Sequence, residues 1–263
     1  MMTKTIKIYQ IAAFTDKLFA GNPAAVCVLD QWLPEKTMQD IGAENNLAET
    51  AFVVKREHDY EIRWFTPTIE VALCGHATLA SAHVLFNFYN QTDSIRFFSR
   101  HSGDLSVSKK GEFLSLDFPS DTPNKREAPQ EILNAFKLKP MEVYRGKTDY
   151  MLLYSNQKEI EQLDPDMSRL KKSKPRGIIV TAPGLNVDFV SRFFAPGSGV
   201  DEDPVTGSAH TTLTPFWSQQ LNKKVLHAQQ LSKRGGNLVC EILGERVKIT
   251  GKAITYLIGE IRV

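Results

Sequence analysis

The chain has 263 residues, of which 42% are hydrophobic and 24% are charged, and its formal net charge is +2 at pH 7. This balance is typical of a folded protein, and it excludes a disordered chain and a strongly basic nucleic-acid-binding surface. The length suits one large domain or two ordinary ones.

The amino-terminal segment lacks the long apolar core of a signal peptide. The longest stretch without Asp, Glu, Lys or Arg is 71–92, and its apolar centre is too short to span a bilayer. Three cysteines, Cys27, Cys74 and Cys240, stand in apolar surroundings, which suits a reducing compartment better than a disulfide framework. We therefore expect a cytoplasmic protein that acts on a small molecule, with no nucleic acid or membrane as partner.

In the first half, short apolar runs predict strands, and two longer segments predict helices. Residues 34–46 have helical spacing and end in a pair of asparagines, which favours a helix stop. The segment that follows Gly75 is apolar on most faces and long enough for a buried helix. Strands are predicted at 6–14, 24–29, 50–55, 60–65, 94–98, 104–108 and 113–118.

The polar segment 119–130 carries three prolines and predicts a domain linker. The second half repeats the scheme of strands around one helix, which begins near Thr206. Its strands are predicted at 177–181, 187–194, 236–243, 246–249 and 253–261. We predict an α+β fold with an N-terminal half, 1–122, and a C-terminal half, 123–263, whose last strand could return to the first half. No phosphate-binding glycine motif supports a nucleotide fold.

Two segments share one pattern, about half the chain length apart. Residues 63–79 read RWFTPTIEVALCGHATL, and residues 192–213 read RFFAPGSGVDEDPVTGSAHTTL. Each has Arg, an aromatic residue, Phe, a small residue and Pro, and later Gly-His-Ala or Gly-Ser-Ala before an apolar segment. We expect two related halves with a small-molecule site in the cleft between them. The second copy is longer, and we assign Asp203 to its insertion.

The two glycine-led helix starts are candidate anion-binding sites. A helix N-terminus exposes unpaired amide donors and partial positive charge, and glycine lets a ligand approach the backbone. Gly75 and His76 in the first copy, and Gly207 and Ser208 in the second, could therefore bind a carboxylate or an enolate. The alternative is that these glycines only begin helices.

Three ionisable residues are candidates for acid–base chemistry. Glu49 is flanked by small and apolar residues, and burial would raise its pKa toward a range useful for proton transfer; alternatively, it points to solvent. His76 could exchange protons or donate hydrogen bonds near neutral pH, or serve only at the helix start. Asp203 precedes a proline and could present its carboxylate to the site, or form a turn or cap.

A metal site and a two-thiol site are both disfavoured. Cys74, His76 and His83 give at most three ligands without a known zinc spacing, so no metal is predicted. An epimerase with one thiol on each face of its substrate would need a second cysteine at the matching position, which is Thr206.

Together these segments resemble the PhzF-like isomerase family of phenazine biosynthesis. The motifs that carry the resemblance are GNPAAV, AET, FTP…CGHAT and EDPVTGSAH, within stretches 13–29, 45–53, 62–85, 192–217 and 230–238. One departure is Ala12, where the family often has an aspartate. The resemblance implies the diaminopimelate epimerase-like fold, with two pseudo-symmetric halves, each a curved, mostly antiparallel sheet around a central apolar helix, no cofactor and commonly a homodimer.

The resemblance also implies roles for individual residues. Glu49 would shuttle a proton between carbons of a conjugated cyclohexadiene amino acid, and His76, Asp203, Gly207 and Ser208 would hold the substrate and steer the proton. A proton shift by one base is the function we expect. The alternatives are an amino-acid epimerase or racemase, with His76 or Asp203 opposite Glu49, and a non-catalytic binding protein of the same fold.

Overall fold

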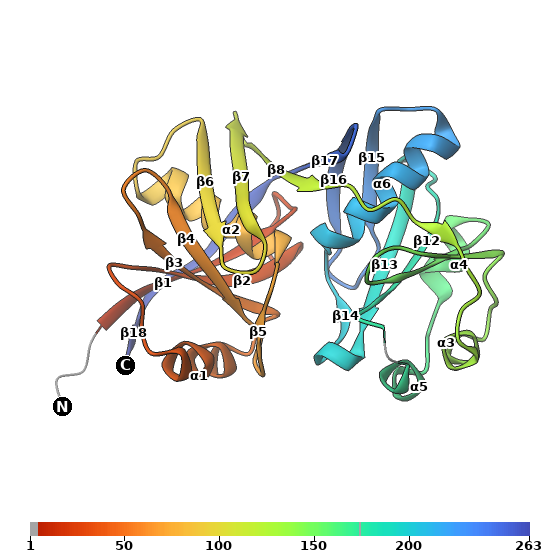
Figure 1. The fold of residues 1–263 in the computed structure, drawn as a ribbon, viewed down its shortest axis with the longest axis horizontal. Coiled ribbons are helices and arrows are strands. Elements are labelled where there is room, and N and C mark those ends of the chain that lie inside the picture. Colours follow the sequence, from red (N-terminus) through yellow and green to blue (C-terminus); the bar gives the residue numbers. More distant parts are fainter. Residues whose placement is uncertain (1–4, 174) are drawn as a thin grey trace. The chain divides into compact units, whose positions relative to one another are not determined.

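The computed structural model describes residues 5–173 and 175–263, and the chain divides into two compact units (Figure 1). The first unit runs to Asp117 and takes up Thr250–Val263, and the second is Phe118–Ile249. The last strand, β18 (Ala253–Arg262), belongs to the first unit because it pairs antiparallel with β1 (Thr5–Ala13). Within the described part of the chain, no helix has the length and apolar character to cross a membrane.

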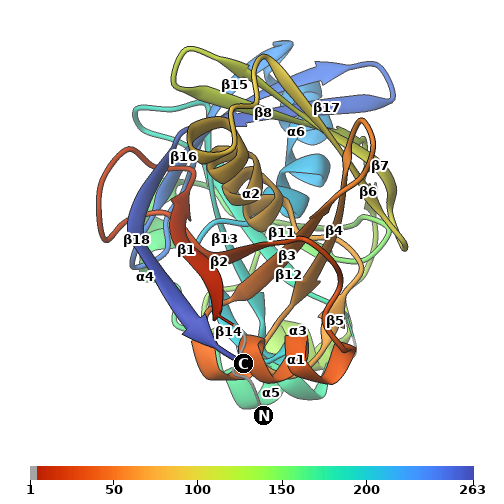
Figure 2. The same ribbon diagram turned by 90° about the vertical axis from the view of Figure 1, so that its left-hand side faces the viewer.

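The first unit is a curved sheet around helix α2 (Gly75–Phe88), as Figure 2 shows. Strand β2 (Asn22–Leu29) pairs antiparallel with β1 and parallel with β3 (Glu49–Lys55). Helix α2 has no Asp, Glu, Lys or Arg and is buried along nearly its whole length, so the predicted apolar helix is confirmed. The remaining strands of this unit are β4 (Tyr60–Phe65), β5 (Glu70–Val71), β6 (Ser94–Ser99), β7 (Gly103–Lys110) and β8 (Phe113–Pro119), the last of which runs into the second unit.

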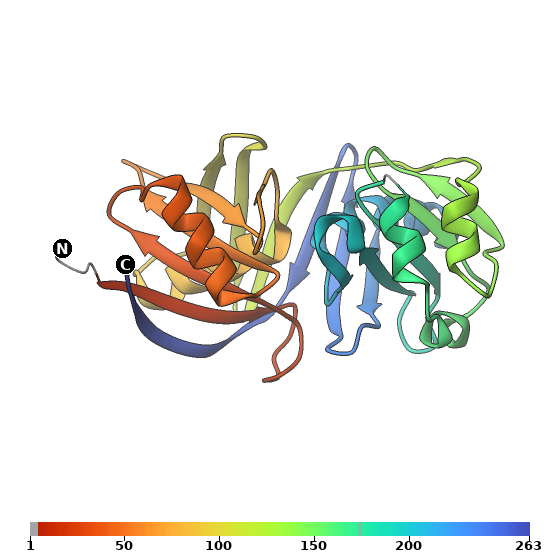
Figure 3. The same cartoon turned by 90° about the horizontal axis from the view of Figure 1, so that it is seen from below.

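Helix α1 (Glu35–Asn45) covers the other side of this sheet (Figure 3). It buries Met38 and Ile41 in a core that includes Phe52 and Phe65. Full burial of each such side chain contributes about 1.5–3 kcal/mol. The helix stops at Asn46, whose φ of 47° is left-handed and whose N–H bonds to a carbonyl of the last turn. Three residues, 46–48, therefore separate the helix from Glu49, the first residue of β3.

The second unit repeats this architecture around helix α6 (Gly207–Leu221). Strands β11 (Tyr150–Leu153) and β12 (Ile178–Pro183) are parallel, and β12 is antiparallel to β13 (Phe189–Ala195). Three six-residue helices, α3 (Gln130–Ala135), α4 (Gln157–Gln162) and α5 (Met167–Lys172), each bury apolar side chains in the same core. The other elements are β9 (Asn124–Lys125), β10 (Glu142–Arg145), the 3-10 turn η1 (Pro196–Ser198), β14 (Val200–Asp203), β15 (Val225–Gln230), β16 (Gly236–Leu243) and β17 (Arg246–Gly251).

Helix α6 contains Pro215, which has no N–H to donate to the carbonyl of Thr211 one turn earlier. The backbone N–H of Asp121 bonds to that carbonyl at 3.1 Å instead. The Asp121 carboxylate also accepts a hydrogen bond from the Thr212 hydroxyl at 2.8 Å. The proline therefore frees an acceptor that ties the start of the predicted linker segment to the helix.

The strand registers show which residues of the two units correspond. The repeated segments place Phe65 on β4 and Phe194 on β13 at equivalent positions, and these pair with Thr50 and Ile178. Thr50 and Ile178 are therefore equivalent, and so are the residues directly before them: Glu49 in the first unit corresponds to Gly177 in the second. The second unit therefore holds a glycine where the first holds its candidate base.

The same registers correct the placement of Asp203. Val71 pairs with Trp64, and Asp203 pairs with Phe193 at the equivalent position of the second unit. Asp203 thus has a counterpart in the first copy and does not come from an insertion. The extra residues of the second copy lie earlier, where η1 forms.

Candidate functional site

The first group of candidate residues, the Glu49 cluster, consists of Glu49, His76, Cys74 and Asn22. Glu49 begins β3, and His76 is the second residue of α2. Glu49 Oε2 lies 3.1 Å from His76 Nε2, and the two side chains are 16% and 5% exposed. One carboxylate oxygen is thus buried against the imidazole, while part of the glutamate stays accessible.

Two buried neighbours hold the other nitrogen of the imidazole. His76 Nδ1 lies 3.0 Å from Asn22 Nδ2 and 3.5 Å from Cys74 Sγ. In the neutral ring with its proton on Nε2, Nδ1 accepts from these groups while Nε2–H faces Glu49. In the charged ring both nitrogens carry protons, and Nδ1–H then needs the Asn22 amide oxygen or the Cys74 sulfur as its acceptor. Asn22 follows Gly21, whose φ of 66° and close approach to the Ala13 carbonyl leave no room for a Cβ atom.

Electrostatics in this cluster favour a proton on His76. Burial by itself lowers the pKa of His76, but the negative charges that Cys74 and Glu49 can carry, and its close contacts with both side chains, raise it well above its usual value. Burial and the Glu49 charge raise the pKa of the Cys74 thiol to about 11. The thiol is therefore neutral at physiological pH, and Glu49 is the charge that stabilises the imidazolium.

The ligand atoms of Glu49, Cys74 and His76 lie within 4.8 Å of one another, a spacing that could hold a metal ion. Binding an ion would take a proton from the Cys74 thiol, whose pKa is about 11 here, and would replace the contact between Glu49 and His76.

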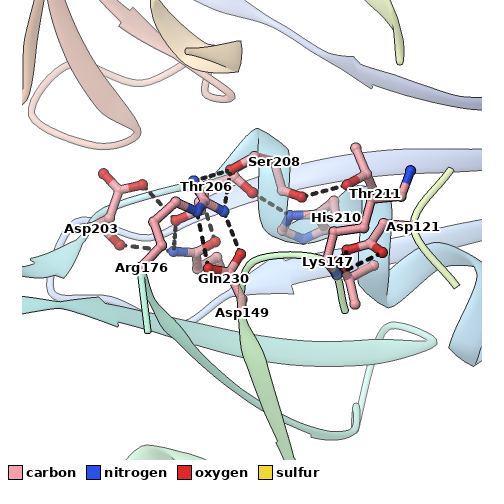
Figure 4. A network of polar contacts seen from close by, with 11 residues as sticks. Asp121, Lys147, Asp149, Arg176, Asp203, Thr206, Ser208, His210, Thr211 and Gln230 are labelled. Carbon is pink, nitrogen blue, oxygen red and sulfur yellow. Dashed lines mark hydrogen bonds and ion pairs between the residues drawn. The ribbon is translucent and has the colours of Figure 1, made fainter. Parts of the chain in front are cut away.

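The second group, the Ser208 cluster, consists of Asp149, Arg176, Asp203, Thr206, Ser208 and Gln230 (Figure 4). Thr206 is the cap residue of α6, and its hydroxyl donates to Asp203 Oδ2 at 2.5 Å. The buried Gln230 accepts from the Thr206 N–H at 2.8 Å and donates to the Asp203 carbonyl at 2.8 Å. Gln230 thereby fixes the Asp203 strand to the helix start, next to Gly207 and Ser208.

Arg176 and Asp149 form an ion pair beside the same helix start. They precede β12 and β11, and the Tyr150 N–H donates to the Gly177 carbonyl at 3.2 Å, which brings the two segments together. Asp149 is 1% exposed, and its carboxylate accepts from Arg176 Nε at 3.0 Å and also from Nη2. Burial raises the pKa of Asp149, and the adjacent guanidinium opposes that shift.

The structure thus places the predicted residues in two sets. It brings Glu49, Gly75 and His76 together in the first unit, and Asp203, Gly207 and Ser208 in the second. Their functional roles stay predictions. Ala12, at the position where the resembling family often has an acid, is buried on β1 opposite Pro23.

Sequence reasoning missed four members of these clusters. Asn22 and Gln230 lie inside motifs that carried the resemblance, but no local pattern gave them a role. Asp149 stands directly before β11 and Arg176 two residues before β12, and only the parallel pairing of those strands joins them.

Comparisons with known proteins agree across the chain. The profile of the family described as phenazine biosynthesis-like protein matches residues 11–259. A Pseudomonas aeruginosa protein named as an uncharacterised isomerase is 48% identical, over 98% of this chain and 99% of its own length. The crystal structure of a PhzF-family phenazine biosynthesis protein from Enterococcus faecalis has a TM-score of 0.94 and 46% identity, covering 98% of this chain and 99% of that chain.

A more distant likeness concerns the fold alone. A hydroxyproline epimerase from Agrobacterium vitis has a TM-score of 0.64 at 9% identity, covering 98% of this chain and 93% of that chain. The predicted diaminopimelate epimerase-like α+β fold is confirmed by these structures and by the repeated architecture of the two units.

Proposed function

Because the chain belongs to the phenazine biosynthesis-like family and is an isomerase of that family, we propose that it moves a proton between two carbons of a small, cyclic, carboxylate-bearing, amino-acid-like substrate. The reaction would use the side chains of the protein and no cofactor. The contact between Glu49 and His76 carries this proposal: a mostly buried carboxylate has one oxygen held by an imidazole and part of its surface open.

Glu49 is the general base and then the general acid. It takes a proton from a carbon next to a conjugated system, and the electron pair of that C–H bond moves into the conjugated system. The protonated glutamic acid then returns the proton to the carbon at the other end, so atoms and charge balance. His76, with a proton on Nε2, holds Oε2 and leaves the other oxygen to face the substrate.

A helix start is the position we assign to the substrate carboxylate. Gly75 and Gly207 each begin a helix whose first amides have no partner within the helix, and glycine allows close approach there. Ser208 adds a hydroxyl, and Asp203 has its carboxylate fixed by Thr206 as a partner for a substrate ammonium or hydroxyl group.

The test is turnover of trans-2,3-dihydro-3-hydroxyanthranilate and related cyclic amino acids by wild type and Glu49→Gln. Loss of the proton carrier should lower kcat by at least about 10²-fold, the usual contribution of general acid–base catalysis. Glu61→Gln is a matched control because its side chain is also 16% exposed and also pairs at 3.1 Å, with Arg100. Turnover that survives in Glu49→Gln would overturn the assignment.

An amino-acid epimerase or racemase is the second candidate, since a protein named as a hydroxyproline epimerase shares the fold. Stereoinversion requires acid–base groups on both faces of a carbon, and the counterpart of Glu49 is Gly177. Incubation of amino acids in deuterium oxide separates the two functions. Exchange at the alpha carbon with loss of optical rotation favours an epimerase, and exchange at a ring carbon with retained rotation favours the proton shift.

The homodimer implied by the resemblance stays a prediction. Sedimentation equilibrium at micromolar concentration tests it, with a mass twice the 29.6 kDa of the chain as the expected result.

A further inference from the structure

The two units place charged side chains one residue apart in their repeated fold, each in contact with the second residue of the central helix. In the first, Glu49 begins β3 and contacts His76, the second residue of α2, at 3.1 Å. In the second, Arg176 precedes Gly177, the counterpart of Glu49, and contacts Ser208, the second residue of α6. Arg176 Nη1 and Nη2 each lie 3.2 Å from Ser208 Oγ. Beside the start of its central helix, the first unit thus has an acidic side chain and the second unit has a cationic one.

Arg176 is held in place from two sides. The buried Asp149 carboxylate takes its Nε and one terminal nitrogen, a two-point contact that fixes the plane of the guanidinium. The ring of Phe193 lies 5.5 Å from the guanidinium carbon. The Arg176 side chain nevertheless stays 40% exposed, so its positive charge is open to solvent beside the helix start.

The contact with Ser208 sets the direction of the serine hydroxyl. Arginine has only donors, so Ser208 Oγ accepts from Arg176 and the hydroxyl hydrogen must point elsewhere. A hydroxyl that accepts two bonds from a cation is itself a stronger donor, because each bond polarises the next. An anionic acceptor is the partner that this arrangement favours most.

We propose that Arg176, anchored by Asp149, is a specificity-determining residue that acts through Ser208 to select a carboxylate-bearing ligand at the start of α6. This inference rests on the proposed function for the identity of the ligand as an amino-carboxylate. Arg176 is a positioning residue: it orients and polarises the hydroxyl, and it takes no part in proton transfer.

The test compares two probes of the same shape, anthranilate and its neutral amide, anthranilamide. Titration of ¹⁵N-labelled protein, followed at the backbone amides of Gly207 and Ser208, gives an affinity and a location for each probe. Wild type should bind anthranilate about 10-fold more tightly than anthranilamide, since a hydrogen bond to a charged group is that much stronger. In Arg176→Gln/Asp149→Asn the preference should fall to within about twofold.

The double variant removes both charges together, so no buried carboxylate is left without its partner. Lys125→Gln is the matched control, because it removes a cation of the same unit whose ion pair, among the described residues, is with the side chain of Glu142. It should keep the wild-type preference. Adding Ser208→Ala to the double variant should cause no further loss, since Arg176 acts through that hydroxyl.

Three results would overturn the inference. They are a wild type with no preference for anthranilate, a double variant that keeps the preference, and a further loss when Ser208→Ala is added. Glu49→Gln separates this inference from the proposed function. If Glu49→Gln keeps turnover while the carboxylate preference depends on Arg176, only the proposed mechanism fails; the reverse pattern defeats only the inference.

Discussion

Gly177→Ala tests why the second unit has no counterpart of Glu49. A Cβ atom added to Gly177 would lie 2.1 Å from Cζ and 2.6 Å from Cε2 of Phe193. Carbon atoms pack best at about 3.5–4.0 Å, so the ring must move by more than an ångström. Phe193 is only 4% exposed and has little space to move into.

Two opposing effects set the expected magnitude. Overpacking of this kind costs about 1–3 kcal/mol. Alanine also restricts the unfolded chain, which returns about 0.4–1 kcal/mol. We expect Gly177→Ala to lower the free energy of unfolding by about 1–2 kcal/mol, and the melting temperature by about 2–8 °C.

Urea denaturation followed by circular dichroism measures this loss. Gly197→Ala is the control, because a Cβ atom there meets nothing within 4 Å, and its stability should stay within about 1 kcal/mol of wild type. Phe193→Leu should relieve the overlap, so the double-mutant cycle should show a favourable coupling of about 1 kcal/mol. A stable Gly177→Ala, or a loss that Phe193→Leu does not relieve, would refute the packing argument.

Three further predictions concern the Glu49 cluster. Glu49→Gln removes the charge that opposes burial, so the pKa of His76 should fall, which NMR titration of the ring measures. The pKa of His76 is higher in the folded protein than its value of 6.5 in the unfolded chain, so protonated His76 stabilises the fold fully only below pH 6.5. Wild type should therefore exceed Glu49→Gln in stability most at pH 6, and the difference should shrink as the pH rises through the folded pKa. Urea denaturation at pH 6 and 9 measures this difference, and a constant difference would contradict the argument. Cys74→Ser should keep kcat within about 10-fold of wild type, since a neutral thiol is no base, whereas a 10²-fold loss would implicate the thiol in proton transfer.

The parts of the fold that sequence predicted have long or regular patterns. The two apolar helices were clear because almost every residue of α2 is apolar or small. The α3, α4 and α5 helices were not predicted, since each has six residues and isolated helices of that length are unstable in water. Only packing into the core of the second unit fixes them.

The clusters were predictable where a motif carried the residue, and not where tertiary pairing did. Glu49 and His76 were candidates from their local surroundings, and the expected partial burial of Glu49 is observed at 16% exposure. Arg176 and Asp149 lie 27 positions apart, and only the parallel strands β11 and β12 bring them together. The loop alignment that assigned Asp203 to an insertion was wrong, because strand pairing, not sequence length, sets which residues correspond.

The correspondence between the units bears directly on how many bases the enzyme has. If both units had a carboxylate at the Glu49 position, each helix start would lie next to a group that can take up a proton. Stereoinversion requires two such groups, one on each face of the reacting carbon. Instead the second unit has Gly177, packed so closely on Phe193 that even a Cβ atom would force the ring to move, and the charge beside it is the cation Arg176. Guanidinium does not lose its proton at physiological pH, so it cannot act as a base. It can only attract or orient an anion. A duplicated fold with one carboxylate and one guanidinium therefore favours a single base over the two bases that stereoinversion requires.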